Sequence, residues 1–159
     1  MNTSRAVKSF MKSRLSRALR RTSLANVFAE IYRTNAWRDP ESVSGRGSTL
    51  ARTTVITSHL PVLLQELNAD SLVDAACGDF NWMKHTELKD VKYVGCDVVP
   101  DLIKRNRKLY DNDRRTFIIR DITKHQLPDA DAIFCRDCLI HLSFKRIRDA
   151  VRNFRKTSA

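Results

Sequence analysis

The sequence lacks the features that mark a membrane-spanning or secreted protein. No apolar run approaches the roughly 20 residues that a membrane-spanning helix needs, and the longest ones, such as Leu60–Leu64, suit short core elements. The N-terminus also has no apolar stretch followed by a small-residue cleavage site, which argues against secretion. Internal repeats and low-complexity segments are missing as well. We therefore expect an intracellular protein, cytoplasmic unless the N-terminus directs it elsewhere.

Acidic residues are absent from the first 29 positions. Seven Lys and Arg residues lie there, so this segment carries +7 of the formal net charge of +11. Apolar residues recur in it at three- and four-residue spacing, which predicts a basic helical arm over residues 1–29, followed by a domain over residues 30–159. Three interpretations of the arm stay open: a solvated helix packed on the domain, a mitochondrial presequence, and a binding segment for an anionic partner such as nucleic acid.

Cysteine and glycine are both scarce, with four residues of each. Without a secretory signal, we interpret Cys77, Cys96, Cys135 and Cys138 as reduced thiols. Cys135 and Cys138 have the spacing of half a zinc site, but no second pair accompanies them, so we expect no metal. Two of the four glycines lie in the segment 35–48, which can wrap a ligand or merely connect two helices.

From residue 71 onward, short apolar runs alternate with amphipathic stretches. This pattern predicts strands at 71–75, 92–96, 116–119 and 132–135. Helices are predicted at 81–88, 100–110 and 143–155, and earlier in the chain around 24–32 and 56–67. Such alternation is typical of an α/β fold in which helices cover both faces of a parallel sheet.

Ligands of parallel sheets bind beyond the carboxyl ends of the strands, so the residues that follow each strand are the candidates for a site. After the first strand, Ala76, Cys77 and Gly78 are small enough to let a ligand approach the backbone. Asp97 ends the second strand, nineteen residues after Gly78, and could accept both hydroxyls of a ribose or cap the next helix. Asp121 follows the third strand and suits an exocyclic amino group or a turn.

Two acids bound the fourth strand. Asp131 opens the strand, far from such a site, and we expect it to be structural. Asp137 follows the strand directly, where it could contact a substrate. His141 lies on the approach to the next helix and is either a general base or a structural residue.

These motifs resemble those of class I S-adenosylmethionine-dependent methyltransferases. The shared motifs come in the same order and at similar spacing: Val73-Asp74-x-x-x-Gly78, Gly95-x-Asp97, Asp121, and the run from Asp131 to Leu142. More narrowly, the segments 41–48 and 77–83 are similar to a little-characterised, largely bacterial subgroup. The resemblance implies a Rossmann-like sheet, S-adenosyl-L-methionine as cofactor, and methylation of an oxygen or nitrogen acceptor, with a small molecule or a glycan favoured.

By position, the resemblance also implies three groups of site residues. Cofactor contacts would come from residues after the strands: Asp74, Ala76, Cys77, Gly78, Asp97, Asp121, Ile122 and Arg136. A lid over the cofactor or substrate would come from the segment before the sheet: Trp37, Ser44, Gly45, Gly47 and Ser48. The methyl acceptor would lie beside the candidate catalytic residues Asp137 and His141.

The chain departs from the family pattern in two ways. Only Gly78 survives of the usual Gly-x-Gly-x-Gly turn, which disfavours a dinucleotide but not S-adenosylmethionine, because the latter has no phosphate. The family's sheet also continues beyond the fourth strand, so we expect a truncated domain whose exposed fourth-strand edge permits self-association. The alternatives to an active methyltransferase are a non-catalytic remnant of the fold and a basic nucleic-acid-binding protein.

Overall fold

The centre of the molecule is a four-stranded parallel sheet, seen in a computed structural model that describes residues 23–157. Its strands are β1 (Ser71–Ala75), β2 (Lys92–Asp97), β3 (Arg115–Ile119) and β4 (Ala132–Phe134), arranged in the order β3-β2-β1-β4. Ala75 lies opposite Cys96, and Asp97 lies opposite Ile119, so the central strands end at one edge. The predicted α/β fold with a Rossmann-like parallel sheet is confirmed.

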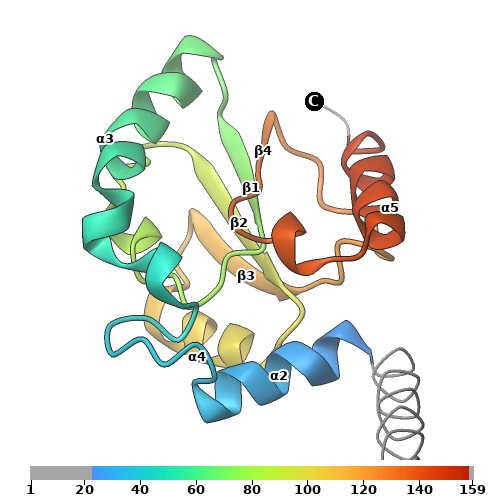
Figure 1. Cartoon of the computed structure of the whole chain (residues 1–159). Helices are drawn as coiled ribbons and strands as arrows, with labels where there is room; N and C mark the ends of the chain where they lie inside the picture. Colours follow the sequence, from blue (N-terminus) through green and yellow to red (C-terminus); the bar gives the residue numbers. More distant parts are fainter. Residues whose placement is uncertain (1–22, 158–159) are drawn as a thin grey trace, which may run out of the picture.

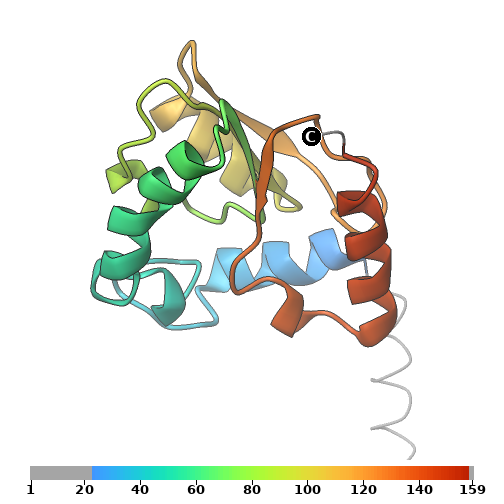
Figure 2. The ribbon, with the colours of Figure 1, turned by 90° about the horizontal axis from the view of Figure 1, so that it is seen from above.

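Helices cover both faces of this sheet (Figures 1 and 2). On one face, α3 (Leu50–Glu66) and α4 (Pro100–Tyr110) pack against the larger hydrophobic core. On the other face, α5 (Phe144–Phe154) contributes Ala150 to a second core. Successive strand residues point to opposite faces, and accordingly Leu72 belongs to the first core and Val73 to the second.

The N-terminal helix α2 (Leu24–Thr34) lies beyond the carboxyl ends of the strands (Figure 1). Ser23 caps it by accepting a hydrogen bond from the Asn26 N–H, and Asn35 ends it in the left-handed conformation. A loop with the short 3₁₀ turn η1 (Arg46–Ser48) then leads to α3. α2 crosses the expected boundary at residue 29, and the rest of the predicted arm, residues 1–22, lies outside the described residues.

Asp131 connects the amino ends of β1 and β4, at the edge of the sheet opposite the carboxyl ends that α2 covers. Its carboxylate accepts hydrogen bonds from the Ser71 hydroxyl (2.6 Å) and the Asp70 N–H (3.0 Å). The Asp131 N–H in turn donates to the Ser71 oxygen at 2.9 Å. The structural role expected for Asp131 is confirmed.

The helix predicted over 81–88 is wrong. The structure has only the 3₁₀ turn η2 (Met83–His85) there. Trp82 lines the cavity at the strand ends and is buried in the same core as its neighbour Met83. Phe80, also buried, has a φ of 60°. The positive φ of Phe80 lies outside the right-handed helical region, and the segment follows an irregular path in which both Trp82 and Met83 are buried.

The other predicted elements are present, and most of their ends lie within one or two residues of the prediction. β1 and α4 have the predicted bounds, while β2, β3 and β4 differ from prediction by one residue each. The helix predicted around 56–67 begins earlier, at Leu50. Ser143 is the N-cap of α5, as its side chain accepts a hydrogen bond from the Arg146 N–H. A further 3₁₀ turn, η3 (Leu139–His141), lies between β4 and α5.

Phe117 lies at the centre of the aromatic packing in the larger core, so its substitution tests how much this core contributes to stability. It is 1% exposed, and its ring lies 5.1 Å from that of Phe80 and 5.8 Å from that of Tyr93. We expect Phe117→Ala to lower the free energy of unfolding by about 3–5 kcal/mol, because it leaves a cavity among these rings. Leu109→Ala, at a position 53% exposed, should cost less than about 1 kcal/mol. Urea denaturation of both variants measures the difference, and equal losses would contradict this description of the core.

Candidate functional site

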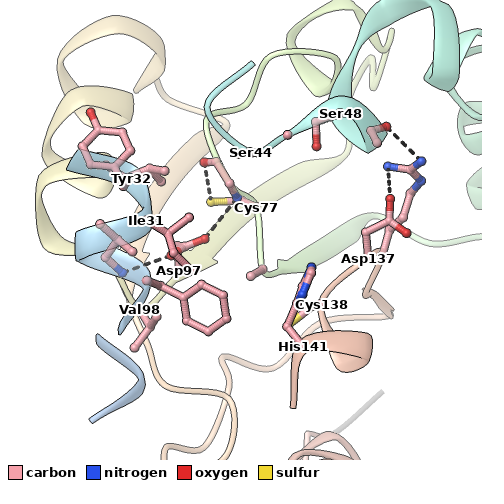
Figure 3. A pocket seen from close by; sticks show the side chains of 18 of the residues that line it. Ile31, Tyr32, Ser44, Ser48, Cys77, Asp97, Val98, Asp137, Cys138 and His141 are labelled. Atoms are coloured by element: carbon pink, nitrogen blue, oxygen red, sulfur yellow. Dashed lines mark hydrogen bonds and ion pairs between the residues drawn. The ribbon is translucent and has the colours of Figure 1, made fainter. Parts of the chain in front are cut away.

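A cavity of about 460 Å³ opens at the carboxyl edge of the sheet (Figure 3). Its walls come from the ends of all four strands, from α2, and from the loop between α2 and α3. All the site residues predicted from the sequence line it: Trp37, Ser44, Gly45, Gly47, Ser48, Asp74, Ala76, Cys77, Gly78, Asp97, Asp121, Ile122, Arg136, Asp137 and His141. Their roles toward a ligand remain predictions.

Gly78 forms the tight turn after β1. Its φ is +56°, and a Cβ added there would lie 2.4 Å from the Ser44 oxygen. The Gly78 N–H donates to a carboxylate oxygen of Asp97 at 3.2 Å, and its carbonyl accepts from the Asn106 side chain at 2.8 Å. A side chain at position 78 would therefore be strained by the positive φ and would collide with Ser44 of the loop.

Asp97 joins this turn to the start of α4. One carboxylate oxygen accepts from Gly78, and the other accepts from the Val99 N–H at 3.0 Å. Val99 is the N-cap residue of α4 and no side chain caps this helix, so the alternative in which Asp97 caps it is wrong. Burial raises the pKa of Asp97, although these backbone hydrogen bonds oppose the rise. The side chain also lines the cavity.

Asp74 is a second buried acid in the cavity wall. It is 3% exposed, and its carboxyl accepts a hydrogen bond from the Tyr93 hydroxyl at 2.7 Å. Burial raises the pKa of Asp74 to about 7, and the charge of Asp97 adds to the rise, while the Tyr93 hydrogen bond opposes it. Near neutral pH, this carboxyl is therefore divided between its acid and its ionised form.

Asp121 behaves differently from these two acids. Its carboxylate accepts from the Thr123 N–H (3.0 Å) and hydroxyl (2.6 Å), and Lys124 lies 3.2 Å away. Burial by itself raises the pKa of Asp121, but the hydrogen bonds from Thr123 and Lys124 bring it below its ordinary value. The turn role considered for Asp121 is therefore present, while the residue and its neighbour Ile122 also line the cavity.

The two candidate catalytic residues lie after β4, across the cavity from Asp97 in Figure 3. Asp137, whose φ is +51°, forms an ion pair with Arg136 at 3.0 Å. The His141 ring stacks on Trp37, with 5.4 Å between ring centroids and 29° between planes. Phe28 of α2 meets His141 edge-on at 6.3 Å. Asp137 and His141 are thus held by different partners rather than by each other.

Several lining residues were not predicted. The main group is the inner face of α2, which supplies Leu24, Phe28, Ile31 and Tyr32. Their three- and four-residue spacing predicts a helix with one apolar face, but nothing local indicates that this face covers the strand ends. Trp82 was also missed, since the segment around it was interpreted as a helix.

The loop before α3 is fastened to the strand ends by polar contacts that the sequence did not reveal. Asp79, which does not line the cavity, accepts hydrogen bonds from the Ser42 hydroxyl at 2.9 Å and from the Val43 N–H at 3.0 Å. Arg136 donates to the Gly47 carbonyl at 3.0 Å. These partners lie 36 to 89 positions apart in the sequence, so no local pattern pairs them.

Within residues 23–157, no group of three or more His, Cys, Asp or Glu side chains could hold a metal ion. The four cysteines are free thiols. A hydrogen bond with Cys138 lowers the pKa of Cys135. Over the same residues, no helix has the length and apolar character required to cross a membrane.

Comparisons with known proteins place these features in a family. A family model described as a methyltransferase domain matches residues 73–158, which is more than half of the chain. No curated protein sequence matches the chain.

Several solved structures are similar in fold. The N-methyltransferase NodS from Bradyrhizobium japonicum WM9, in complex with S-adenosyl-L-homocysteine, has a TM-score of 0.62 at 17% identity, over 81% of this chain and 68% of that one. The DhpI–SAH complex has a TM-score of 0.61 at 16% identity, over 87% and 66%. A SAM-dependent methyltransferase from Anabaena variabilis ATCC 29413 has a TM-score of 0.63 at 15% identity, over 87% and 58%. Such identities show a shared fold only, and the chain spans about two thirds or less of these proteins.

The pKa of Asp74 predicts a pH dependence of stability. The pKa is about 7 in the folded protein and about 3.9 in an unfolded chain. Between these values the folded protein holds a proton that the unfolded chain has lost, so the free energy of unfolding falls as the pH rises from about 4 to about 7. At about 1.4 kcal/mol per pKa unit, the loss amounts to a few kcal/mol.

Asp74→Asn keeps an acceptor for the Tyr93 hydroxyl but does not titrate. We expect this variant to lose much of the decline and to be more stable than the wild type above pH 7. Urea denaturation at several pH values measures both curves, and parallel curves would show that Asp74 does not titrate in this range.

Proposed function

Because the chain belongs to the class I S-adenosylmethionine-dependent methyltransferase domains, we propose that it binds S-adenosyl-L-methionine in the cavity and transfers its methyl group to an oxygen or nitrogen acceptor. The observation that carries this proposal is the convergence of every predicted site residue on one cavity at the strand ends. These residues come from five separate parts of the chain, so their meeting is not a consequence of sequence proximity.

The cavity's size and lining fit the proposed cofactor. Its volume of about 460 Å³ falls within the range of roughly 300–1,000 Å³ that small-molecule sites occupy. Ile122, Val98 and Leu102 offer apolar surface for an adenine ring, and Asp97 offers carboxylate oxygens for ribose hydroxyls. The turn at Ala76–Gly78 has small residues but only one glycine, which suits a ligand without a pyrophosphate.

In this proposal, each wall of the cavity has its own task. Asp97 accepts the ribose hydroxyls, and Asp121 and Ile122 border the adenine. Ala76–Gly78 border the methionine part, together with Arg136. Bound S-adenosylmethionine supplies an electrophilic methyl group on a sulfonium, so the protein's main contribution is to align the acceptor with it.

The acceptor would lie at the other end of the cavity, between the loop and the segment after β4. Asp137 is exposed enough to meet a substrate, with 49% of its side chain accessible. His141 is the candidate to take a proton from the acceptor, and its stacking on Trp37 holds the ring in place. A small molecule or a glycan remains the favoured acceptor, and both fit a cavity of this size better than a folded macromolecule would.

Binding of S-adenosyl-L-homocysteine tests the cofactor site without requiring an acceptor. We expect Asp97→Asn to weaken binding by tenfold or more, since hydrogen bonds to an ionised carboxylate are lost. Asn keeps one oxygen, which can still accept from the Val99 N–H at the start of α4, while its amide group cannot accept from the Gly78 N–H, so part of the loss reflects a weakened turn. Asp113→Asn, at an exposed position, is the matched control and should bind like the wild type. Calorimetry that detects no binding by the wild type would refute the proposed function.

Transfer of a radiolabelled methyl group separates an active enzyme from a non-catalytic remnant. Purified protein is incubated with labelled S-adenosylmethionine and a fractionated cell extract, and products are followed by their label. Labelled product that disappears with Asp137→Ala or His141→Ala would establish catalysis by this cavity. Normal cofactor binding without any labelled product would favour the remnant.

A further inference from the structure

The carboxylate of Asp79 points away from the cavity and into the loop that forms one of its walls. Asp79 is 6% exposed and accepts from the Ser42 hydroxyl and the Val43 N–H through a single oxygen. Its own N–H donates to the Ser44 hydroxyl at 2.8 Å. Ser42 is itself 1% exposed, and its oxygen accepts from the Ser44 N–H at 3.2 Å. One residue of the turn after β1 thus clamps three consecutive residues of the loop.

Two further contacts hold the rest of the loop. The Asn81 side-chain amide donates to Glu41 at 2.7 Å and to the Ser48 carbonyl at 3.1 Å. Arg136 holds the Gly47 carbonyl from the opposite side, after β4. Of these contacts, only the bond from Ser42 to Asp79 is fully buried. Asp79 has no ion-pair partner among residues 23–157, so hydrogen bonds from the loop stabilise its carboxylate.

The loop lies very close to the turn after β1, because position 78 has no side chain. Ser44 occupies the space that a side chain at position 78 would fill, since a Cβ there would lie 2.4 Å from the Ser44 oxygen. Ser44, Gly45, Gly47 and Ser48 all line the cavity from the loop side (Figure 3 labels Ser44 and Ser48). Any movement of the loop away from the turn therefore removes one wall of the cavity.

We propose that Asp79 is a positioning residue that latches residues 42–48 onto the turn after β1 and thereby keeps the cofactor cavity formed before any ligand binds. This proposal rests on the proposed function, because the ligand of the latched cavity is S-adenosylmethionine or its demethylated product. Ordering a loop of this length during binding lowers affinity by the conformational entropy that is lost. A loop already ordered by Asp79 avoids that loss, so the latch sets cofactor affinity without touching the cofactor.

Asp79→Asn tests the latch because it keeps the size of the side chain and removes its charge. Hydrogen exchange of the ligand-free protein, followed by mass spectrometry, should show about tenfold faster exchange in peptides covering 42–48. Peptides covering β1 and β2 should exchange as in the wild type. The dissociation constant for S-adenosyl-L-homocysteine should rise by about tenfold in calorimetry, and Asp113→Asn should change neither quantity.

Ser44→Ala provides a second route to the same result if Asp79→Asn does not fold. It removes the acceptor of the Asp79 N–H and leaves the charge in place, so the exchange of the loop and the dissociation constant should rise together but by less. Weakened binding in both variants together with faster exchange confined to the loop supports the latch. A merely structural role would speed exchange in the strands as well, and that result overturns the proposal.

The two hypotheses fail in different ways. If the wild type binds S-adenosyl-L-homocysteine and Asp79→Asn binds it equally well, the latch is overturned and the proposed function stands. The latch is also overturned if exchange of residues 42–48 is unchanged in both variants. If the wild type does not bind S-adenosyl-L-homocysteine, the proposed function fails, and the latch loses its effect on cofactor affinity with it.

Discussion

The turn at Gly78 is the constraint on which the whole site depends. Its N–H is held by Asp97 at the end of β2, and its carbonyl is held by Asn106 of α4. Its missing side chain leaves the space that Ser44 of the loop occupies. Residues of β2, α4 and the loop, each at least 19 positions from Gly78, therefore converge on it. A larger residue here would strain the backbone at positive φ and would also push the loop away, so the position cannot be repaired by adjusting a single neighbour.

Asn106 shows how tightly that arrangement is packed. It is fully buried, and its side-chain amide donates to the Gly78 carbonyl, while its side-chain oxygen has no hydrogen-bond partner among the described residues. An unpaired buried oxygen costs free energy that a hydrophobic residue would avoid. The amide is nevertheless the group that satisfies Gly78, because the turn directs its carbonyl into α4. Asn106 thus fixes the shape of the turn, but its unpaired oxygen makes the folded protein less stable than it would be with that oxygen hydrogen-bonded.

The sequence predicted the sheet and the strand-end residues well, because both follow from local patterns. A buried strand followed by a small or acidic residue is visible within about ten positions, and parallel strands bring those residues to one edge. The resemblance to a known family added the loop residues Ser44–Ser48. Sequence reasoning placed Asp79 in the turn beneath the cofactor, whereas in the structure it holds the loop and does not line the cavity. It also missed the inner face of α2, because the partners of this face lie far away in the chain. It also failed at 81–88, where Asn81 holds the loop and Trp82 lines the cavity instead of forming a helix.

The same contacts redefine the boundary between the basic arm and the domain. The net charge of residues 1–29 suggested an arm that could be separated at residue 29, but Leu24 and Phe28 line the cavity from α2. Removing residues 1–29 would therefore damage the site together with any nucleic-acid or targeting function of the arm. Removing residues 1–22 leaves α2 and its cap Ser23 in place. Only the shorter deletion can distinguish a separate function of the basic residues from a contribution to the cavity.

Two buried acids in the cavity wall, Asp74 and Asp97, would attract the positive charge of the proposed cofactor. Burial raises the pKa of both Asp74 and Asp97, so keeping these carboxyls ionised near neutral pH costs the ligand-free protein stability. A cation in the cavity favours their ionised forms and recovers part of that cost upon binding. S-adenosylmethionine carries a positive sulfonium, and its demethylated product has a neutral sulfur in its place. In the proposed complex, the buried acids would therefore favour the methyl donor over the product, and more strongly than exposed acids would, since water screens them less.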